Sequence, residues 1–208
     1  MANTTFSGAV RSKGGFTSIS ENSSTGAIST LSSISSTGVS SFDANTLATE
    51  AGTGITGGTG TIYRSSVQRV GGIITTRILI DLTGLRSTAS GDIIGVNGTS
   101  NVCHIGQITA AQNGTILTGS MECFEAPTGG DPDINVHSAT EGTGVEDGAI
   151  SSLTETLLVN AGDATLGSKV YFTAVPAADE FLYLTLGDTT DADYTAGKLF
   201  IELMGYEA

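Results

Sequence analysis

A strict alternation of side chains in residues 74–82 constrains the fold of this chain more than any other feature. Every second residue there is isoleucine, leucine or threonine, whereas Thr75, Arg77 and Asp81 occupy positions between them. Alternation with a period of two is typical of an antiparallel strand that is buried on one face only. The preceding dipeptide, Gly71-Gly72, predicts a two-residue turn, so this strand should form a hairpin with the segment before it.

The predicted hairpin sets Val70 opposite Ile73, and this register determines which side chains share a face. Arg64, Arg77 and Asp81 then lie together on the outer face of the pair. Such a row is either a solvated charge ladder or a docking patch. Arg64 and Arg77 are therefore candidate contact residues.

The dipeptide Asn113-Gly114 is favoured in type I′ turns and predicts a second hairpin, between Val102–Gln112 and Thr115–Ala126. Its register places His104 opposite Cys123 and leaves Cys103 on the opposite side of the sheet, so we expect two free thiols. The core side chains of this hairpin would be Val102, Ile108, Ala110, Leu117, Met121 and Cys123.

Four later segments, each bounded by glycine, proline or aspartate, are predicted as further strands. They lie near Leu153–Val159, Lys169–Val175, Glu180–Leu186 and Lys198–Met204. Several short strands without a convincing amphipathic helix predict an all-β fold for residues 61–208. We expect an antiparallel β-sandwich or a small barrel, jelly-roll-like in architecture.

The first sixty residues have a different composition, and Ser23–Ser41 is almost entirely serine, threonine and glycine. Such a segment cannot bury enough apolar surface to form a core of its own. We therefore interpret residues 1–60 as an extended Ser/Thr/Gly-rich N-terminal arm that ends in a flexible linker, Gly52–Gly60. The arm would lie on a neighbouring molecule or wind with identical arms in a symmetric oligomer, and strand addition would supply its backbone hydrogen bonds.

The charge distribution excludes two classes of partner. The formal net charge is −13, and after Ser87 the only basic residues are Lys169 and Lys198. An acidic domain is repelled by phosphate backbones and by anionic membranes, so neither nucleic acid nor membrane is expected as a partner. The opening residues carry no apolar signal segment, and no run approaches the ~20 apolar residues of a membrane span. We expect the chain to stay in the cytoplasm where it is made unless it leaves inside a particle.

Two short patterns could suggest a cofactor or a metal. Gly52–Gly57 fits G-x-G-x-x-G, but a predicted hairpin follows instead of a helix, so we interpret the match as chance. His104 beside Cys123 lacks the further ligands of a structural zinc site, and a core histidine next to a buried thiol is the interpretation we favour. With only two histidines and no cofactor motif, neither catalysis nor a cofactor is expected.

Aspartates gather in two loops. Asp188, Asp191 and Asp193 lie within six residues, and the choice between a calcium site and a solvated loop stays open. Asp131 and Asp133, in contrast, are expected to hydrogen-bond their own backbone in turns.

Three stretches resemble virion structural proteins of tailed phages of marine bacteria. They are NTTFSGAVRSKGGF (Asn3–Phe16), MECFEAPTGGDPDIN (Met121–Asn135) and YTAGKLFIELMGY (Tyr194–Tyr206). The resemblance implies a capsid decoration, or cement, protein, which is a small β protein that binds the outside of an assembled head. It further implies the major capsid protein as partner, a homotrimer, and a place on the capsid surface of the virion after assembly in the host cytoplasm. No site residues come with the resemblance.

The arm carries the remaining candidate contact residues. Phe6 and Phe16 bracket Arg11, and Lys13 adds a second positive charge to an otherwise neutral segment. We expect the two aromatic side chains to anchor the arm on the capsid, with the acidic domain facing solvent. Two alternatives stay open: a head or tail fibre component with a receptor-binding β domain, and a carbohydrate-binding module. The latter would need exposed aromatic residues on one sheet face.

Overall fold

The computed structural model describes residues 16–21, 28–34, 40–42 and 47–207, in two compact units, Met1–Ala44 and Asn45–Ala208. The strands of the first unit are β1 (Phe16–Glu21), β2 (Ile28–Ile34) and β3 (Ser40–Phe42). They pair in the antiparallel order β1-β2-β3. These residues therefore form a small sheet within the chain instead of an extended arm, and strand addition to a neighbouring molecule stays a prediction. Strands that are close in sequence lose little chain entropy on pairing, so they pair with each other.

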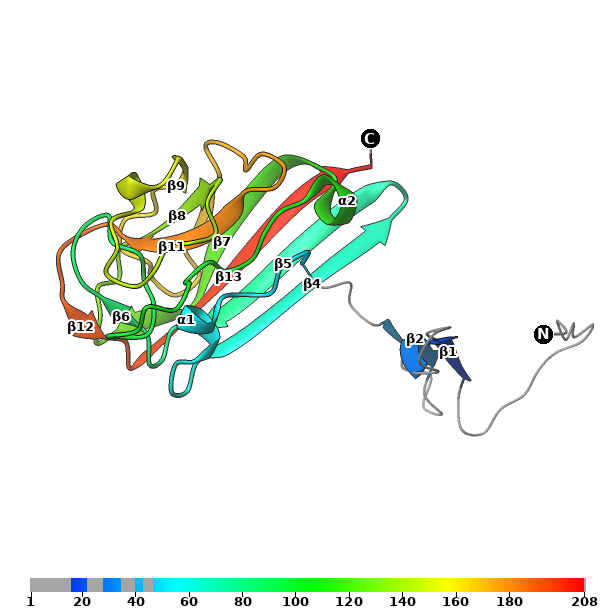
Figure 1. Cartoon of the computed structure of the whole chain (residues 1–208), viewed down its shortest axis with the longest axis horizontal. Helices are drawn as coiled ribbons and strands as arrows, with labels where there is room; N and C mark the ends of the chain where they lie inside the picture. Colours follow the sequence, from blue (N-terminus) through cyan, green and yellow to red (C-terminus); the bar gives the residue numbers. More distant parts are fainter. Residues whose placement is uncertain (1–15, 22–27, 35–39, 43–46, 208) are drawn as a thin grey trace, which may run out of the picture. The chain divides into compact units, whose positions relative to one another are not determined.

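The second unit is an antiparallel β-sandwich, which confirms the predicted fold class (Figure 1). Its large sheet has the order β10-β7-β13-β5-β4 and its small sheet the order β11-β8-β9. The strands of the large sheet are β4 (Ile62–Val70), β5 (Ile73–Asp81), β7 (Thr115–Thr128), β10 (Lys169–Tyr171) and β13 (Ala196–Tyr206). Those of the small sheet are β8 (Ile134–Ala139), β9 (Glu155–Val159) and β11 (Phe181–Leu186). The remaining elements are α1 (Thr53–Thr56), β6 (Arg86–Ser87), α2 (Ala110–Asn113), the 3₁₀ helix η1 (Ile150–Ser152) and β12 (Ala192–Asp193).

The hairpin around Gly71-Gly72 is confirmed in every detail of its register. Val70 pairs with Ile73, and Arg64, Ser66 and Gln68 follow on the same face of β4. Both turn glycines have positive φ, 60° and 82°, which a type I′ turn requires at its two central positions. The four strands predicted after residue 150 are confirmed as well, with shifted ends.

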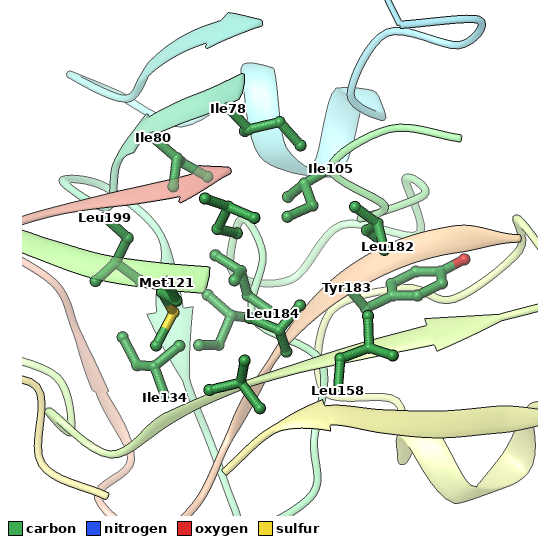
Figure 2. Close-up of a cluster of buried hydrophobic side chains, with 14 of the residues drawn as sticks. Ile78, Ile80, Ile105, Met121, Ile134, Leu158, Leu182, Tyr183, Leu184 and Leu199 are labelled. Carbon is green, nitrogen blue, oxygen red and sulfur yellow. The ribbon is translucent and has the colours of Figure 1, made fainter. Parts of the chain in front are cut away.

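The core lies between the two layers (Figure 2). Ile78 and Ile80 of β5 and Leu199 of β13 face the small sheet, where Leu182 and Leu184 of β11 meet them. All five side chains are fully buried. Burying a side chain of this size contributes about 1.5–3 kcal/mol, so this contact layer holds the two sheets together.

The second predicted hairpin, at Asn113-Gly114, is wrong. Residues 102–108 do not pair with β7 but run beside β11, where the N–H of Ile105 donates to the carbonyl of Leu182 at 2.7 Å. Helix α2 then turns the chain into β7. β7 pairs instead with β13 and β10, which come much later in the sequence.

Side-chain caps explain why Asn113 ends a helical turn and not a strand. The hydroxyl of Thr109 accepts a hydrogen bond from the N–H of Gln112, and the amide oxygen of Asn113 accepts one from the N–H of Thr109. The amide nitrogen of Asn113 donates to Thr76 in the core. These local bonds give the backbone an alternative to a sheet ladder.

Because that hairpin does not form, some of its side chains differ in burial or partner from the prediction. His104 does not face Cys123, and Leu117 is 56% exposed. Ile108, Met121 and Cys123 are buried as predicted. Both cysteines are buried free thiols, so that expectation is confirmed although its register argument is wrong.

The glycine-rich segment Gly52–Gly60 is part of the β domain, so its interpretation as a flexible linker is wrong. Ile55 in α1 is fully buried, and Leu47 upstream of it is 2% exposed. A Cβ atom on Gly54 would lie 2.3 Å from the sulfur of Cys103. Glycine is present there because the backbone packs closely, and the domain begins at Asn45 instead of residue 61.

Truncation tests this domain boundary. We expect a chain that starts at Asn45 to keep the stability of the β domain, and a chain that starts at Thr61 to lose at least about 4 kcal/mol, because Leu47 and Ile55 leave the core. Ile55→Ala alone should cost about 2–5 kcal/mol. Thr53→Ala, at an exposed position of the same helix, is the matched control and should change stability by less than about 0.5 kcal/mol. Urea denaturation measures all four, and equal midpoints for the two truncations would contradict the boundary.

Candidate functional site: the open face of the large sheet

The large sheet has one face in the core and one face that no other described element of the domain covers. On β13 the side chains of Leu199, Ile201 and Leu203 are buried, so the alternate residues point away from the core. The strand registers extend this division across the sheet. We call the outward surface the open face. It comprises Ile62, Arg64, Ser66, Gln68, Val70, Ile73, Thr75, Arg77, Leu79, Asp81, Leu117, Thr118, Ser120, Glu122, Phe124, Lys169, Tyr171, Lys198, Phe200, Glu202, Met204 and Tyr206.

Exposed apolar side chains gather on the open face. Of the eleven large hydrophobic residues that are exposed in the described part of the chain, eight belong to it. These are Ile62, Val70, Ile73, Leu117, Phe124, Tyr171, Met204 and Tyr206, and Val70 and Tyr171 are each 67% exposed. Single exposed hydrophobic residues are ordinary, but a concentration on one face marks an interaction surface.

Two phenylalanines form the aromatic centre of one end of this face. The rings of Phe124 and Phe200 stack with centroids 5.1 Å apart and an angle of 10° between their planes. A bulge in β7, where the register shifts opposite Lys198, turns Phe124 outward. Beside it lies a shallow hollow of about 540 Å³ that is lined by Phe124, Glu125, Ala126, Thr128, Leu166, Ala196 and Lys198.

The charges of the open face are paired across its strands. Nε of Arg77 lies 2.8 Å from a carboxylate oxygen of Glu202. The ammonium group of Lys198 binds both Asp81, at 3.3 Å, and Glu125. Burial acts to raise the pKa of Asp81, but hydrogen bonds from Thr83 and Lys198 outweigh it and lower that pKa. The half-exposed pair of Arg77 with Glu202 contributes about 0–1 kcal/mol, so it organises the face more than it stabilises the fold.

The predicted contact residues have different outcomes. Arg64 and Arg77 do share the open face with Asp81, as predicted. The guanidinium of Arg64 donates to the backbone oxygen of Tyr63, and no carboxylate among the described residues pairs with it. Three of the arm candidates (Phe6, Arg11 and Lys13) lie outside the described residues, and for Phe16 only its backbone position in β1 is described.

The residues considered for a metal site, His104 and the aspartates of the loop at residues 188–193, contact other residues of the domain. The ring of His104 packs 5.0 Å from that of Phe181, and its Nδ1 is buried without a hydrogen-bond partner in the described chain. Arg86 binds Asp191 at 2.8 Å and Asp193 at 2.9 Å. Across residues 47–207 and the three arm strands, no group of three or more His, Cys, Asp or Glu residues is placed to hold a metal ion.

The turn predicted at Asp131 is confirmed. Its carboxylate accepts a hydrogen bond from the N–H of Asp133 at 2.9 Å, as an Asx turn requires. The other carboxylate oxygen of Asp131 accepts one from the N–H of Thr190. Asp131 is therefore held both by its own turn and by the backbone of a second loop at Thr190, whereas Oδ1 of Asp133 is buried without a hydrogen-bond partner among the described residues, so a turn capped by Asp133 is not confirmed.

Sequence reasoning missed the aromatic and aliphatic residues of the open face. Phe200, Met204 and Tyr206 share the outward face of β13 with Lys198 and Glu202, so this strand carries large apolar residues on both faces. That pattern is a readable signal, because a strand with one solvated face should carry polar residues at these positions. No sequence pattern marks Phe124 as outward, because a bulge in β7 determines the direction of its side chain.

Comparison with known proteins identifies no relative: no family model, no curated protein and no solved structure matches the chain. Among the described residues, no helix has both the length and the apolar composition needed to cross a membrane.

The buried histidine generates a pH test. Burial lowers the pKa of His104 below its usual 6.5, so below that pH the unfolded chain binds more protons than the folded one. We expect the free energy of unfolding to be highest above pH 6.5 and to fall below it, by at most about 1.4 kcal/mol per pH unit for this residue.

His104→Gln should reduce this slope in urea titrations between about pH 7.5 and pH 5.5, around the unperturbed histidine pKa of about 6.5. His137 is also buried, and burial lowers its pKa while Glu155, 3.6 Å away, opposes the shift. The variant should therefore keep part of the slope, and His104→Gln with His137→Gln should remove more of it. An unchanged slope in the double variant would refute the assignment.

Proposed function

We propose that this chain is a structural virion protein that binds the outer surface of a phage head as a decoration, or cement, protein. The observation that carries the proposal is the gathering of eight of the eleven exposed large hydrophobic residues on the open face. The resemblance of three sequence stretches to phage virion proteins supports the choice of partner, the major capsid protein. The function needs neither a catalytic residue nor a cofactor.

The composition of the open face supports protein binding. Aromatic residues, methionine and arginine are enriched in protein interfaces, and Phe124, Tyr171, Met204 and Arg77 supply each of these types here. Because most charges of the face already neutralise each other, a partner can cover them without supplying a counter-charge to each. Arg64 is the position where a carboxylate of the partner would complete a pair.

On a capsid, a weak contact for each molecule is sufficient for stable binding. Its surface repeats the same site many times, so molecules that contact the head and one another gain from effective concentration. Each copy of the chain then needs only a modest contact. Charged residues make up only 14% of the chain, so much of its surface can enter a contact without burying a charge.

The arm is the second proposed contact. Phe6 and Phe16 would anchor it, and Arg11 and Lys13 would meet capsid carboxylates. The open face and the arm can both contribute, and their shares are separable by mutation.

Co-sedimentation with undecorated heads tests the open face. Phe124→Ser with Tyr171→Ser should weaken binding by at least about 30-fold, because one buried aromatic anchor contributes about 2 kcal/mol. The matched control is Leu157→Ser with Val175→Ser, which removes two exposed hydrophobic residues outside the open face and should bind normally. Arg64→Ala should weaken binding modestly and reduce its salt dependence.

The outcomes separate the two contacts. If the open-face variant binds normally while Phe6→Ala with Phe16→Ala abolishes binding, the arm is the anchor. If wild-type protein does not bind heads, and an antibody labels only tails in negative-stain images, the fibre alternative replaces decoration.

A second candidate function is favoured by one observation. Phe124, Phe200, Tyr171 and Tyr206 place four aromatic rings on the same sheet face, which is the feature a carbohydrate-binding module needs. A flat ring packs against the apolar face of a sugar. Binding to a glycan array that is lost in Phe124→Ser with Tyr171→Ser would favour this candidate, and an empty array would exclude it.

A further inference from the structure

Strand β4 forms one edge of the large sheet, and we propose that two copies of the chain pair through it. The two β4 strands would run antiparallel about a two-fold axis at Ser66. The result is a continuous ten-stranded sheet with both open faces on the same side. The inference does not depend on capsid binding.

The edge of β4 is long and regular. β4 has nine residues, pairs with β5 without a register shift, and contains no proline. Figure 1 shows it along the margin of the large sheet, with β5 on its inner side. Edge strands are usually protected from other chains by bulges, prolines or short length, and β4 has none of these.

The backbone groups of alternate residues point away from β5. In a two-residue hairpin Val70 and Ile73 form a hydrogen-bonded pair, so Tyr63, Ser65, Val67 and Arg69 direct their N–H and C=O groups outward. Between described residues, no backbone hydrogen bond joins these four to any other element. The one bond that they receive comes from the guanidinium of Arg64 to the carbonyl of Tyr63.

This pattern selects the register. In an antiparallel pair the residues with outward-pointing backbone groups must lie opposite each other. All four such residues take part only if Tyr63 of one copy lies opposite Arg69 of the other, and Ser65 opposite Val67. The two-fold axis then passes midway between the two Ser66 residues, which face each other. About eight new backbone hydrogen bonds would form, two for each outward residue of one chain.

The side chains are complementary in this register. Ile62 and Val70, which are 44% and 67% exposed, would face each other at both ends of the pair. Arg64 would face Gln68, whose amide oxygen accepts a hydrogen bond from Arg77 at 3.4 Å and has a second lone pair for Arg64 of the other copy. A second copy of the same strand therefore fits without opposing two like charges.

Arg64 and Arg69 of β4 are the main argument against this pairing, because charged residues often prevent two edge strands from pairing. The two Arg64 residues, however, lie on opposite sides of the axis, about 14 Å apart at 3.4 Å per residue along the strand. That separation exceeds the Debye length of about 8 Å at physiological salt. Arg69 is already bound to Glu207 at 2.6 Å, which lowers its effective charge at the edge.

Site-directed cross-linking tests the register. In a non-hydrogen-bonded pair the Cα atoms lie about 4.5 Å apart, within the range of a disulfide, so Ser66→Cys should give a covalent dimer under mild oxidation. Arg64→Cys and Gln68→Cys should cross-link when the two variant proteins are mixed and should give no covalent dimer when oxidised separately. Thr75→Cys, on the same face but one strand inward, is the control and should not cross-link. The native cysteines are buried and give little background.

Light scattering across a dilution series provides an independent readout. Wild-type protein should show twice the mass of the chain, and Ser65→Pro should be monomeric, because it removes an outward N–H without breaking the ladder to β5. Monomeric wild type with no Ser66→Cys cross-link would overturn the proposal. A trimer that does not cross-link at residue 66 would overturn it too, and would support the assembly that the phage resemblance implies.

Discussion

The fold depends on the pairing of β13 between β7 and β5. β13 is the last strand in the chain, yet it occupies the centre of the large sheet and buries Leu199, Ile201 and Leu203 against the second layer. β5 comes more than a hundred residues earlier. Without β13, the hairpin of β4 and β5 would have no neighbour on its inner side, and β7 would keep only the short strand β10.

This arrangement explains why the molecule has an open face. The second layer consists of three strands and the irregular segment that runs beside β11, and it packs on only one side of the large sheet. The outward residues of five strands are then left to solvent or to a partner. Because the bulges in β7 turn Leu117 and Phe124 outward, the same sheet supplies both the regular core and the apolar surface proposed for binding.

The residues of the candidate site that could be predicted are those placed by interactions between neighbours in the sequence. Arg64, Arg77 and Asp81 were placed on one face from the hairpin alone, because a two-residue turn sets the register of both strands. The Phe124–Phe200 stack could not be found in this way, since it joins β7 to β13 through a bulge. The Asn113-Gly114 prediction failed for a related reason: the caps around Thr109 and the bond from Asn113 to Thr76 favour a helical turn that the dipeptide alone does not reveal.

The all-β class, the hairpin at Gly71-Gly72 and the positions of the later strands follow from the sequence alone, because alternation and turn chemistry are local properties of the chain. Three features became known only from the folded molecule: β13 joins β5 to β7, Gly54 packs against Cys103, and Leu47 and Ile55 belong to the core. These features depend on which surfaces meet after the chain has folded. A glycine needed for close packing and a glycine in a flexible linker look the same in a sequence, and the space around them distinguishes the two.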